Sequence, residues 1–217
     1  GRLLNRRLLA TGGVGQEGGR DRDDSLYWVE STITPLKSVT GQIAGHVAVQ
    51  RDVTAAVEEE NSSREARQWA ELLARIAGLM ADQQPLNERI ENAIASIVEA
   101  LSADSPTSAM IYTFETPSQT LRLMHSAGSA ELRDDDHGVA SESLRSLREL
   151  VSQTGELVVR ESEASGGRYF VPLMHARRCE GVLVLRSSAP VSHDAGRLEA
   201  LRQIGEALAL AIVRERA

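Results

Sequence analysis

Cys179 is the residue with the most reactive chemistry, because a thiolate is both a nucleophile and a metal ligand. It is the one cysteine of the chain, and His175 stands four residues before it across an expected hairpin connection. A histidine at this spacing could serve as the base that activates the thiol. A structural zinc site needs about four ligands, so these two residues do not predict one. A cysteine without catalytic use on an edge strand is the favoured interpretation.

Two further polar features could bind a metal or haem. The run Asp-Asp-Asp-His at 134–137 is dense in ligand types, but consecutive residues point apart and cannot converge on one ion. We interpret it as a solvated acidic turn before a helix and predict no metal site. His125 shares a strand face with Leu121 and Leu123, which directs it toward a core or pocket. It could ligate haem, but a hydrogen-bonded, half-buried histidine is commoner and nothing else supports haem.

The segment TGGVGQEGGRDRDDS at 11–25 contains a literal G-x-G-x-x-G, which runs from Gly13 to Gly18. Such glycines bind a dinucleotide only where they open a helix, because the helix N-terminus holds the pyrophosphate. No helical period follows them here. We predict a disordered loop at 11–25, because glycine and charge cannot bury enough surface to offset the entropy of ordering. A short strand at 3–7 could precede it.

The composition is that of an ordinary soluble globular protein. The 217 residues include 24 Lys and Arg against 31 Asp and Glu, a net charge of -7. This balance argues against nucleic-acid binding, which needs a basic face. The apolar run at 207–213 is far shorter than the about 20 residues that span a bilayer. With no secretory signal at the start, we predict a cytoplasmic protein without a membrane segment, and the opening Gly1 suggests a piece of a longer chain.

The hydrophobic pattern predicts an α+β fold. Residues 26–36 and 43–50 are rich in β-formers and flank a turn at Gly41, which indicates an antiparallel hairpin. The pattern becomes helical after Thr54, and Pro85 starts a second helix. The remaining elements expected are strands at 108–115, 121–127 and 157–159, a helix around 144–151, a hairpin of 168–175 and 180–187 joined by 176–179, and a final helix at 197–212.

Two of the helices carry narrow apolar seams at three- and four-residue spacing. Such a seam must be buried against something. We predict a homodimer in which the first helix is a coiled-coil linker, and we weigh equally that this helix lies on its own domain. The seam residues are Trp69, Leu72, Ile76, Leu198, Leu201 and Leu208.

Residues 27–54, YWVESTITPL…GQIAGHVAVQRDVT, resemble the C-terminal half of a PAS domain. They match its last hairpin and the Asp-x-Thr, here Asp52 and Thr54, that precedes a signalling helix. The resemblance implies that this pair fixes the angle of the helix and relays a signal. The physical reason is that a short polar side chain can bind the exposed N–H groups of a first helical turn. The strands and helices that complete a PAS pocket are missing, so no cofactor residue is implied.

Residues 86–216 resemble a GAF domain. The matching pieces are the opening helix, SAMIYTFETPSQTLRLMHSAG at 108–128, RYFVPLMHARRCEGVLVLRSS at 168–188 and the closing helix RLEALRQIGEALALAI. The resemblance implies a central antiparallel sheet with helices on one side. It also implies regulation, by binding a small molecule or dimerising and passing a change to an output domain. Only 161–167 precede the Val-Pro-Leu strand, where GAF domains usually have a long connection over the ligand, which argues against a nucleotide-sized pocket.

A haem or nucleotide ligand is what the resemblance allows, although none is required. We expect no catalysis. The free-methionine sulfoxide reductase of the GAF family works through several cysteines, which Cys179 alone cannot replace. Cys179 also does not match the bilin-attaching positions of phytochrome-like GAF domains. The side chains expected to line a pocket, each of which could instead be plain core, are Met110, Tyr112, Met124, His125, Tyr169 and Val171.

These features together predict the sensory module of a bacterial signalling protein, such as a two-component system. Its parts would be a truncated PAS-like segment at 1–54, a signalling-helix linker at 55–84 and a GAF-like domain at 85–217. The module would relay a change to a covalently linked output domain of the histidine kinase or diguanylate cyclase type. A purely structural dimerisation domain is the alternative, and a GAF-family enzyme is disfavoured because no nucleophile, base and orienting group can be assembled.

Overall fold

The structure, a computed structural model, describes residues 13–20, 26–102, 105–115, 120–129, 146, 150–151, 154–162, 166–189 and 193–216. The chain divides into two compact units, Gly1–Glu65 and Ala66–Ala217, and the division falls inside helix α2 (Thr54–Ala81). The linker predicted at 55–84 is therefore shared between the two units instead of standing alone. Within the described residues, no helix combines the length and the apolar character needed to cross a membrane.

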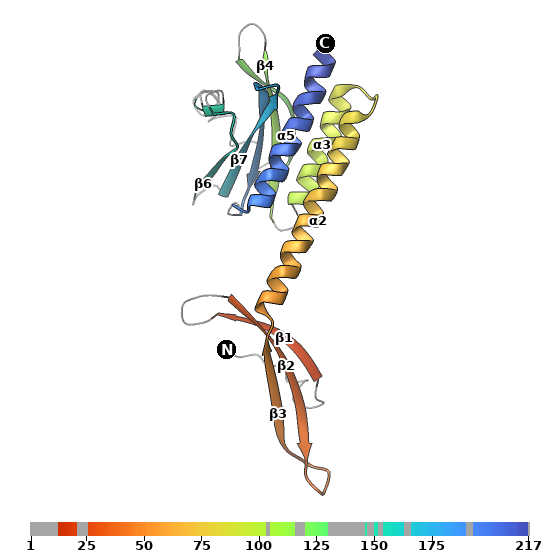
Figure 1. Ribbon diagram of the computed structural model, residues 1–217, viewed down its shortest axis with the longest axis vertical. Coiled ribbons are helices and arrows are strands. Elements are labelled where there is room, and N and C mark those ends of the chain that lie inside the picture. Colours follow the sequence, from red (N-terminus) through yellow and green to blue (C-terminus); the bar gives the residue numbers. More distant parts are fainter. Residues whose placement is uncertain are drawn as a thin grey trace. The chain divides into compact units, whose positions relative to one another are not determined.

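Unit 1 is built on a three-stranded antiparallel sheet in the order β1-β2-β3 (Figure 1). Its strands are β1 (Gly13–Arg20), β2 (Leu26–Lys37) and β3 (Ile43–Asp52). The hairpin predicted from 26–36 and 43–50 is confirmed, with Gly41 at a positive φ of 80° in the turn. Helix α2 begins directly after β3.

The disordered loop predicted at 11–25 is wrong for residues 13–20, which form strand β1 and pair with β2 from Gly13 opposite Ile33 to Arg20 opposite Leu26. Backbone pairing needs no apolar side chain, so composition did not reveal it. The glycines have a steric role, because a Cβ added at Gly19 would come within 2.6 Å of the Tyr27 ring. The G-x-G-x-x-G motif thus lies in a strand and not at a helix start. The predicted strand at 3–7 and the rest of the loop lie outside the described residues.

Unit 2 contains a five-stranded antiparallel sheet in the order β5-β4-β8-β7-β6. In chain order the elements are α3 (Leu86–Leu101), β4 (Thr107–Glu115), β5 (Thr120–Gly128), β6 (Val158–Ser162), β7 (Gly166–His175), β8 (Arg178–Ser187) and α5 (Ala195–Arg216). The predicted α+β class is confirmed. The hairpin of β7 and β8 is tighter than expected, because only Ala176 and Arg177, both at positive φ, make the turn. The helix expected around 144–151 lies mostly outside the described residues.

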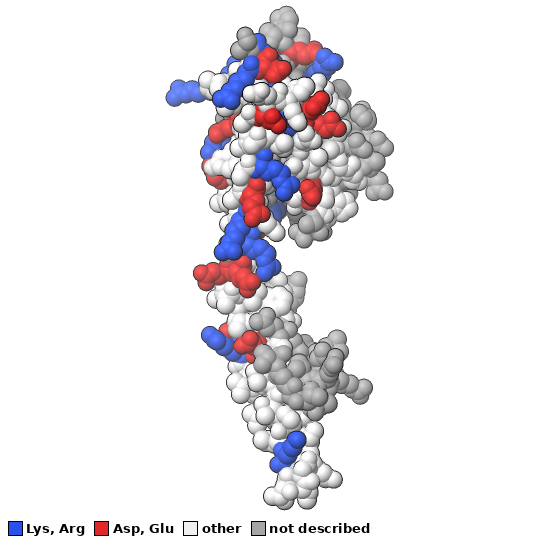
Figure 2. Space-filling view, turned by 90° about the vertical axis from the view of Figure 1, so that its right-hand side faces the viewer, with Lys and Arg blue, Asp and Glu red and all other residues white. Residues whose placement is uncertain are grey.

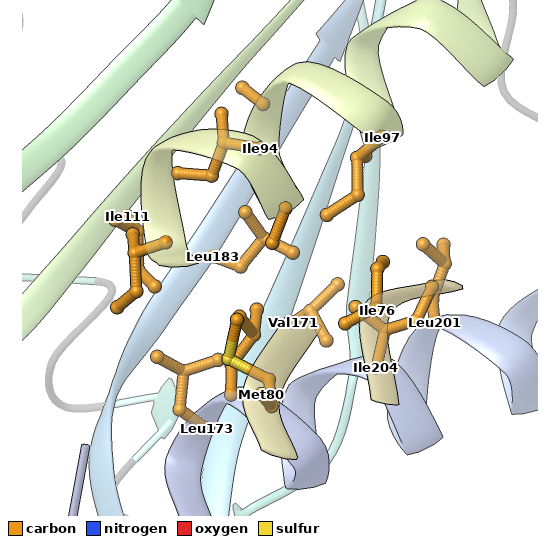
Figure 3. Close-up of a cluster of buried hydrophobic side chains, with 14 of the residues drawn as sticks. Ile76, Met80, Ile94, Ile97, Ile111, Val171, Leu173, Leu183, Leu201 and Ile204 are labelled. Atoms are coloured by element: carbon orange, nitrogen blue, oxygen red, sulfur yellow. The ribbon is translucent and has the colours of Figure 1, made fainter. Parts of the chain in front are cut away.

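The main core of unit 2 lies between one face of this sheet and three helices, α3, α5 and the second half of α2 (Figures 1 and 3). Helix α5 approaches the sheet closely at Gly205, where a Cβ would lie 2.8 Å from the carbonyl oxygen of Pro172 in β7. Side chains from all four elements interdigitate there, among them Ile76, Met80, Ile94, Ile97, Val171, Leu173, Leu183, Leu201 and Ile204.

The residues predicted as a dimer seam are instead part of this core. Ile76, Leu201 and Leu208 are completely buried within the single chain, and Trp69 and Leu72 are 8% and 4% exposed. Leu198 is half-buried and packs against the same cluster. Side chains this enclosed cannot meet a second copy while the fold is intact. The prediction of a seam between copies at these positions is therefore wrong, and the alternative that the helix lies on its own domain is correct.

Candidate functional site

The face of the five-stranded sheet opposite to α2, α3 and α5 carries a second apolar cluster. Its buried members are Met110, Tyr112, Val151, Phe170, Val182 and Val184, and Leu121, Val158 and Cys179 pack at its margin. We call these nine residues the sheet-face cluster. Most of them come from the even-numbered positions of four strands, because successive residues of a strand point to opposite faces.

The register of the strands places these side chains in rows across the sheet. Met110 in β4 lies opposite Val184 in β8, which lies opposite Phe170 in β7, and Phe170 lies opposite Val158 in β6. In a parallel row, Tyr112 lies opposite Val182. The Tyr112 hydroxyl donates to the sulfur of Met110 at 3.5 Å. The result is a continuous apolar cluster whose six central members are between 1% and 8% exposed, with the Tyr112 hydroxyl among them. Apolar side chains with a polar group among them are the usual composition of a small-molecule site.

The six predicted pocket residues divide between the two faces of the sheet, and only Met110 and Tyr112 belong to the sheet-face cluster. Tyr169, Val171 and Met124 belong to the core under the helices, on the other face of the sheet. His125 is half-buried and lies opposite Ile111, a residue of that same core, next to a register shift between Ile111 and Tyr112.

The sheet-face cluster also contains Phe170, Val182 and Val184, which the sequence-based list of pocket residues did not include. The signal was present in the sequence, because Tyr169 and Phe170 are neighbours on one strand and cannot share a face. Choosing Phe170 and rejecting Tyr169 would have required knowing which face the helices cover. Periodicity separates the two faces of a strand but does not identify them.

Cys179 lies at the margin of the cluster in a setting that suppresses its reactivity. The ladder pairs it with Met174 and pairs His175 with Arg178, and the thiol donates to the carbonyl oxygen of Gly181 at 3.1 Å. Burial raises the pKa of the thiol above its ordinary value. The activated thiol considered from the sequence is therefore not supported by the geometry.

A prediction follows for the rate at which Cys179 reacts with iodoacetamide. Because its pKa is raised, the reactive thiolate should be scarce at pH 8, and alkylation of the folded protein should be slower than that of glutathione. The rate should keep rising as the pH increases beyond 9. Mass spectrometry of timed samples measures it, with urea-unfolded protein as the control. Fast labelling of the folded chain at pH 7 would show an activated thiol.

Asp52 and Thr54 form a joint between the sheet of unit 1 and the start of α2. The Asp52 carboxylate accepts hydrogen bonds from the backbone N–H of Thr54 at 2.9 Å and from its hydroxyl at 2.6 Å. The hydroxyl in turn accepts from the backbone N–H of Trp28 at 2.8 Å, and the N–H of Val53 donates to the carbonyl of Trp28 at 2.9 Å. Thr54 therefore ties the helix to strand β2, while Asp52 caps its first N–H.

Charged side chains of both signs cover much of the exposed surface of unit 2. Figure 2 shows Lys and Arg interspersed with Asp and Glu there, whereas the strands of unit 1 are largely uncharged and expose large apolar side chains, among them Leu26, Leu36 and Val49. On α5, Arg202 pairs with Glu206 and, at 2.6 Å, with Glu199. Hydrogen bonds from Arg202 and Gln203 lower the pKa of Glu199 to about 2. Exposed ion pairs of this kind contribute little to stability. Within the described residues no three His, Cys, Asp or Glu side chains gather at a metal-binding distance, and the run at 134–137 lies outside them.

Known structures share this architecture. The GAF domain of a phosphoenolpyruvate-protein phosphotransferase (ptsP) from Coxiella burnetii superposes with a TM-score of 0.54 at 14% identity, over 70% of this chain and 96% of that one. Unit 2 has the GAF fold. A free methionine-R-sulfoxide reductase from Neisseria meningitidis, solved with its substrate, superposes with a TM-score of 0.53 at 19% identity, over 70% of this chain and 92% of that one.

Comparison with the sequences of known proteins gives a different kind of relative. No family model matches the chain. A bacterioopsin transcriptional activator of Halobacterium salinarum is 25% identical over 187 residues, which cover 77% of this chain. The chain spans about a quarter of that protein's length, since the match covers 27% of it. These comparisons leave the PAS resemblance of residues 27–54 as a prediction.

Proposed function

We propose that this chain is a sensory or regulatory module without catalysis of its own. The sheet-face cluster of unit 2 binds a small molecule, and helices α2 and α5 carry the resulting change along the protein. Unit 1 acts as a PAS-like input segment whose helix α2 continues into unit 2. The chain then controls a covalently linked output domain.

The main support for the proposal is that the second half of α2 packs in the core of unit 2 and is linked to α5 near both of its ends. Near the start of α5, the guanidinium of Arg197 lies 5.6 Å from the ring centre of Trp69 in α2. Near the end of both helices, buried Arg89 of α3 donates to the carbonyl of Met80 at 2.9 Å and pairs with Glu215 at 3.1 Å. The packed half of α2 thus runs parallel to α5 and is tied to it at two points.

The sheet connects the sheet-face cluster to the same helices. Phe170 and Val171 are adjacent residues of β7, and the first belongs to that cluster while the second contacts α5 next to Gly205. A ligand that shifts β7 must therefore also shift α5, because packed interiors transmit displacements instead of absorbing them. This is the arrangement that a regulatory module requires.

The comparisons support a regulatory function and broaden the choice of output. The solved structures include GAF domains, and the matched relative is a transcriptional activator. An output that controls transcription therefore joins the histidine kinase and diguanylate cyclase types expected from the sequence. The structural dimerisation alternative loses support, because the seam residues assigned to it are buried within one chain. The reductase alternative lacks the several cysteines that its chemistry needs, since this chain has one.

A thermal-shift screen against nucleotides, haem and amino acids tests the proposal. A ligand present at 100 times its Kd should stabilise unit 2 by about 2.7 kcal/mol, which raises Tm by roughly 5–10 °C. Phe170→Ala should weaken this shift, whereas Leu173→Ala, a loss from the helix-covered core, should lower Tm but leave the shift intact. A screen without any shift, together with a dimeric mass in sedimentation, would favour the structural alternative.

A further inference from the structure

One side of the unit 1 sheet is lined by exposed apolar side chains. Alternation along β2 directs its even-numbered residues from 26 to 36 to this side. The register adds two valines of β3, which lie opposite residues 34 and 32 of β2 and therefore point the same way. We call this side the apolar face of unit 1, and its large side chains are Leu26, Trp28, Leu36, Val47 and Val49.

The two sides of this sheet differ strongly in exposure. Leu26 and Val49, on the apolar face, are 62% and 63% exposed. Ser31 and Ile33 of β2 point to the other side and are 3% and 2% exposed. Soluble monomers rarely expose a contiguous apolar patch, and such a patch marks a contact surface. The apolar face is therefore the side of the sheet on which a partner is expected.

The charges on the apolar face are balanced. Between Leu26 and Leu36, the described charged side chains on this side are Glu30 of β2 and Arg51 of β3, which lie directly opposite each other. Opposite charges in this position stabilise a strand pair. With no excess of Lys or Arg among them, the face does not suit an anionic membrane surface, which basic side chains recognise. It suits an apolar partner without net charge.

The size of the apolar face fits a second copy of the same sheet. The strands hold 8, 12 and 10 residues, and each residue covers about 3.3 Å along a strand and about 4.8 Å across it. The flat area is therefore roughly 480 Å². Side chains that stand up from the sheet bring the accessible area closer to the about 800 Å² that a standard interface buries on each partner. A stable contact must use most of the face, and a sheet of the same length and twist can cover it.

We propose that unit 1 forms a homodimer through its apolar face, with the two sheets related by a twofold axis. A twofold contact uses the same patch on both copies, so apolar side chains meet apolar side chains. Two sheets packed in this way lie about 10 Å apart and their side chains interdigitate. Because α2 begins directly after β3, the dimer also joins the starts of two α2 helices. The inference goes beyond the proposed function and does not depend on a ligand in unit 2.

Sedimentation equilibrium of the full chain over a series of concentrations tests the inference. At tens of micromolar, the mass should approach twice that of the 23.5 kDa chain. The dimer should persist at high salt, because ions screen contacts between charges and not those between apolar groups.

Variants then assign the contact to the apolar face. Val49→Asp places a charge within the face and should raise the Kd of the dimer tenfold or more. Leu36→Lys, at another exposed position, serves if the first variant does not fold, and should have a similar effect. Ala48→Asp is the matched control, because it adds the same charge at an exposed position of the same strand but on the other side of the sheet, and it should leave the Kd unchanged. A monomeric variant also provides the background for spin labels on this face, such as one at Val47.

Three results would overturn the inference. The first is a monomer at every concentration. The second is a dimer that survives both Val49→Asp and Leu36→Lys in proteins that circular dichroism shows to be folded, because the copies would then meet elsewhere. The third is a monomeric chain that floats with neutral phosphatidylcholine vesicles, because the face would then bind lipid. None of them affects a thermal shift of unit 2, so the proposed function would stand.

Discussion

Replacing Ile76 with aspartate should unfold unit 2. Ile76 is completely buried between α3, α5 and the sheet, although it lies on the helix whose seam the sequence assigned to a dimer. Loss of such a side chain to alanine alone costs about 2–5 kcal/mol. A buried carboxylate without a partner adds several kcal/mol more. Because a domain is stable by only about 5–15 kcal/mol, this change should remove most of the folded population.

The neighbouring substitution Ala77→Asp is the matched control, because Ala77 is exposed on the same helix. It should leave the melting curve within a few degrees of the parent. Circular dichroism measures melting, and analytical sedimentation measures mass. If Ile76→Asp gave a folded monomer where the parent is a dimer, the seam would be an interface after all.

The helical seam illustrates what periodicity can and cannot predict. The spacing predicted that Trp69, Leu72 and Ile76 share one buried face of the helix, and all three are buried in the structure. It could not show what buries that face, because a second copy and the chain's own sheet present similar apolar surfaces. The contacts with α3, α5 and the sheet join residues far apart in the sequence, and a local pattern carries no information about them.

The same limit explains the pocket prediction. Most strands of unit 2 were predicted within a few residues of their bounds, because their apolar content is high and their turns are short. The side on which each residue lies depends on register, and β5 shifts its register opposite Ile111 and Tyr112.

Strand β1 was missed for a different reason. Its composition predicted a disordered loop, and composition does not show that the backbone can pair with β2. Its glycines and charges resemble a disordered segment, yet it forms a ladder with β2. The aromatic rings of Tyr27 and Trp28 lie over Gly19 and Gly18, so the small residues fit their neighbours. Such complementarity is visible only once the hairpin is formed.

The double substitution Asp52→Ala and Thr54→Ala should release α2 from the sheet of unit 1 while unit 2 stays folded. The pair supplies the hydrogen bonds that tie the first turn of α2 to the backbone of Trp28. Loss of a helix cap such as Asp52 costs about 1 kcal/mol, too little to unfold a domain but similar to the energies that couple distant sites. The core residues of α2 lie more than three turns further along the helix. Their packing should therefore persist.

Strong acid should remove the part of the joint that depends on the Asp52 carboxylate, and leave the hydrogen bond between Thr54 and Trp28. The hydrogen bonds from the hydroxyl and the N–H of Thr54 lower the pKa of Asp52. A carboxylate with a lowered folded-state pKa stabilises the joint above its unfolded value of about 3.9. That contribution is lost as the pH falls through the lowered pKa. The joint should therefore be intact at pH 5 and weaken only in strong acid.

The central claim is that α2 is held firmly at its start by the Asp52–Thr54 joint, so that movement of the sheet in unit 1 becomes movement of the helix. Electron–electron double resonance measures how firmly the helix is held, as the distribution of distances between a label on β3 and a label on α2. The nitroxides are attached at Val47→Cys in β3 and Ser63→Cys in α2, and Cys179→Ser prevents labelling of the native thiol. Both label sites are exposed. Glu58→Ala, which removes another exposed carboxylate near the helix start, is the control.

The parent and the Glu58→Ala variant should give one narrow distribution of distances between the two labels. The Asp52→Ala, Thr54→Ala variant should give a broad one, with unit 2 melting at the parent temperature. Equal widths in the parent and the double variant, whether narrow or broad, would show that the joint does not hold the helix and would contradict the claim.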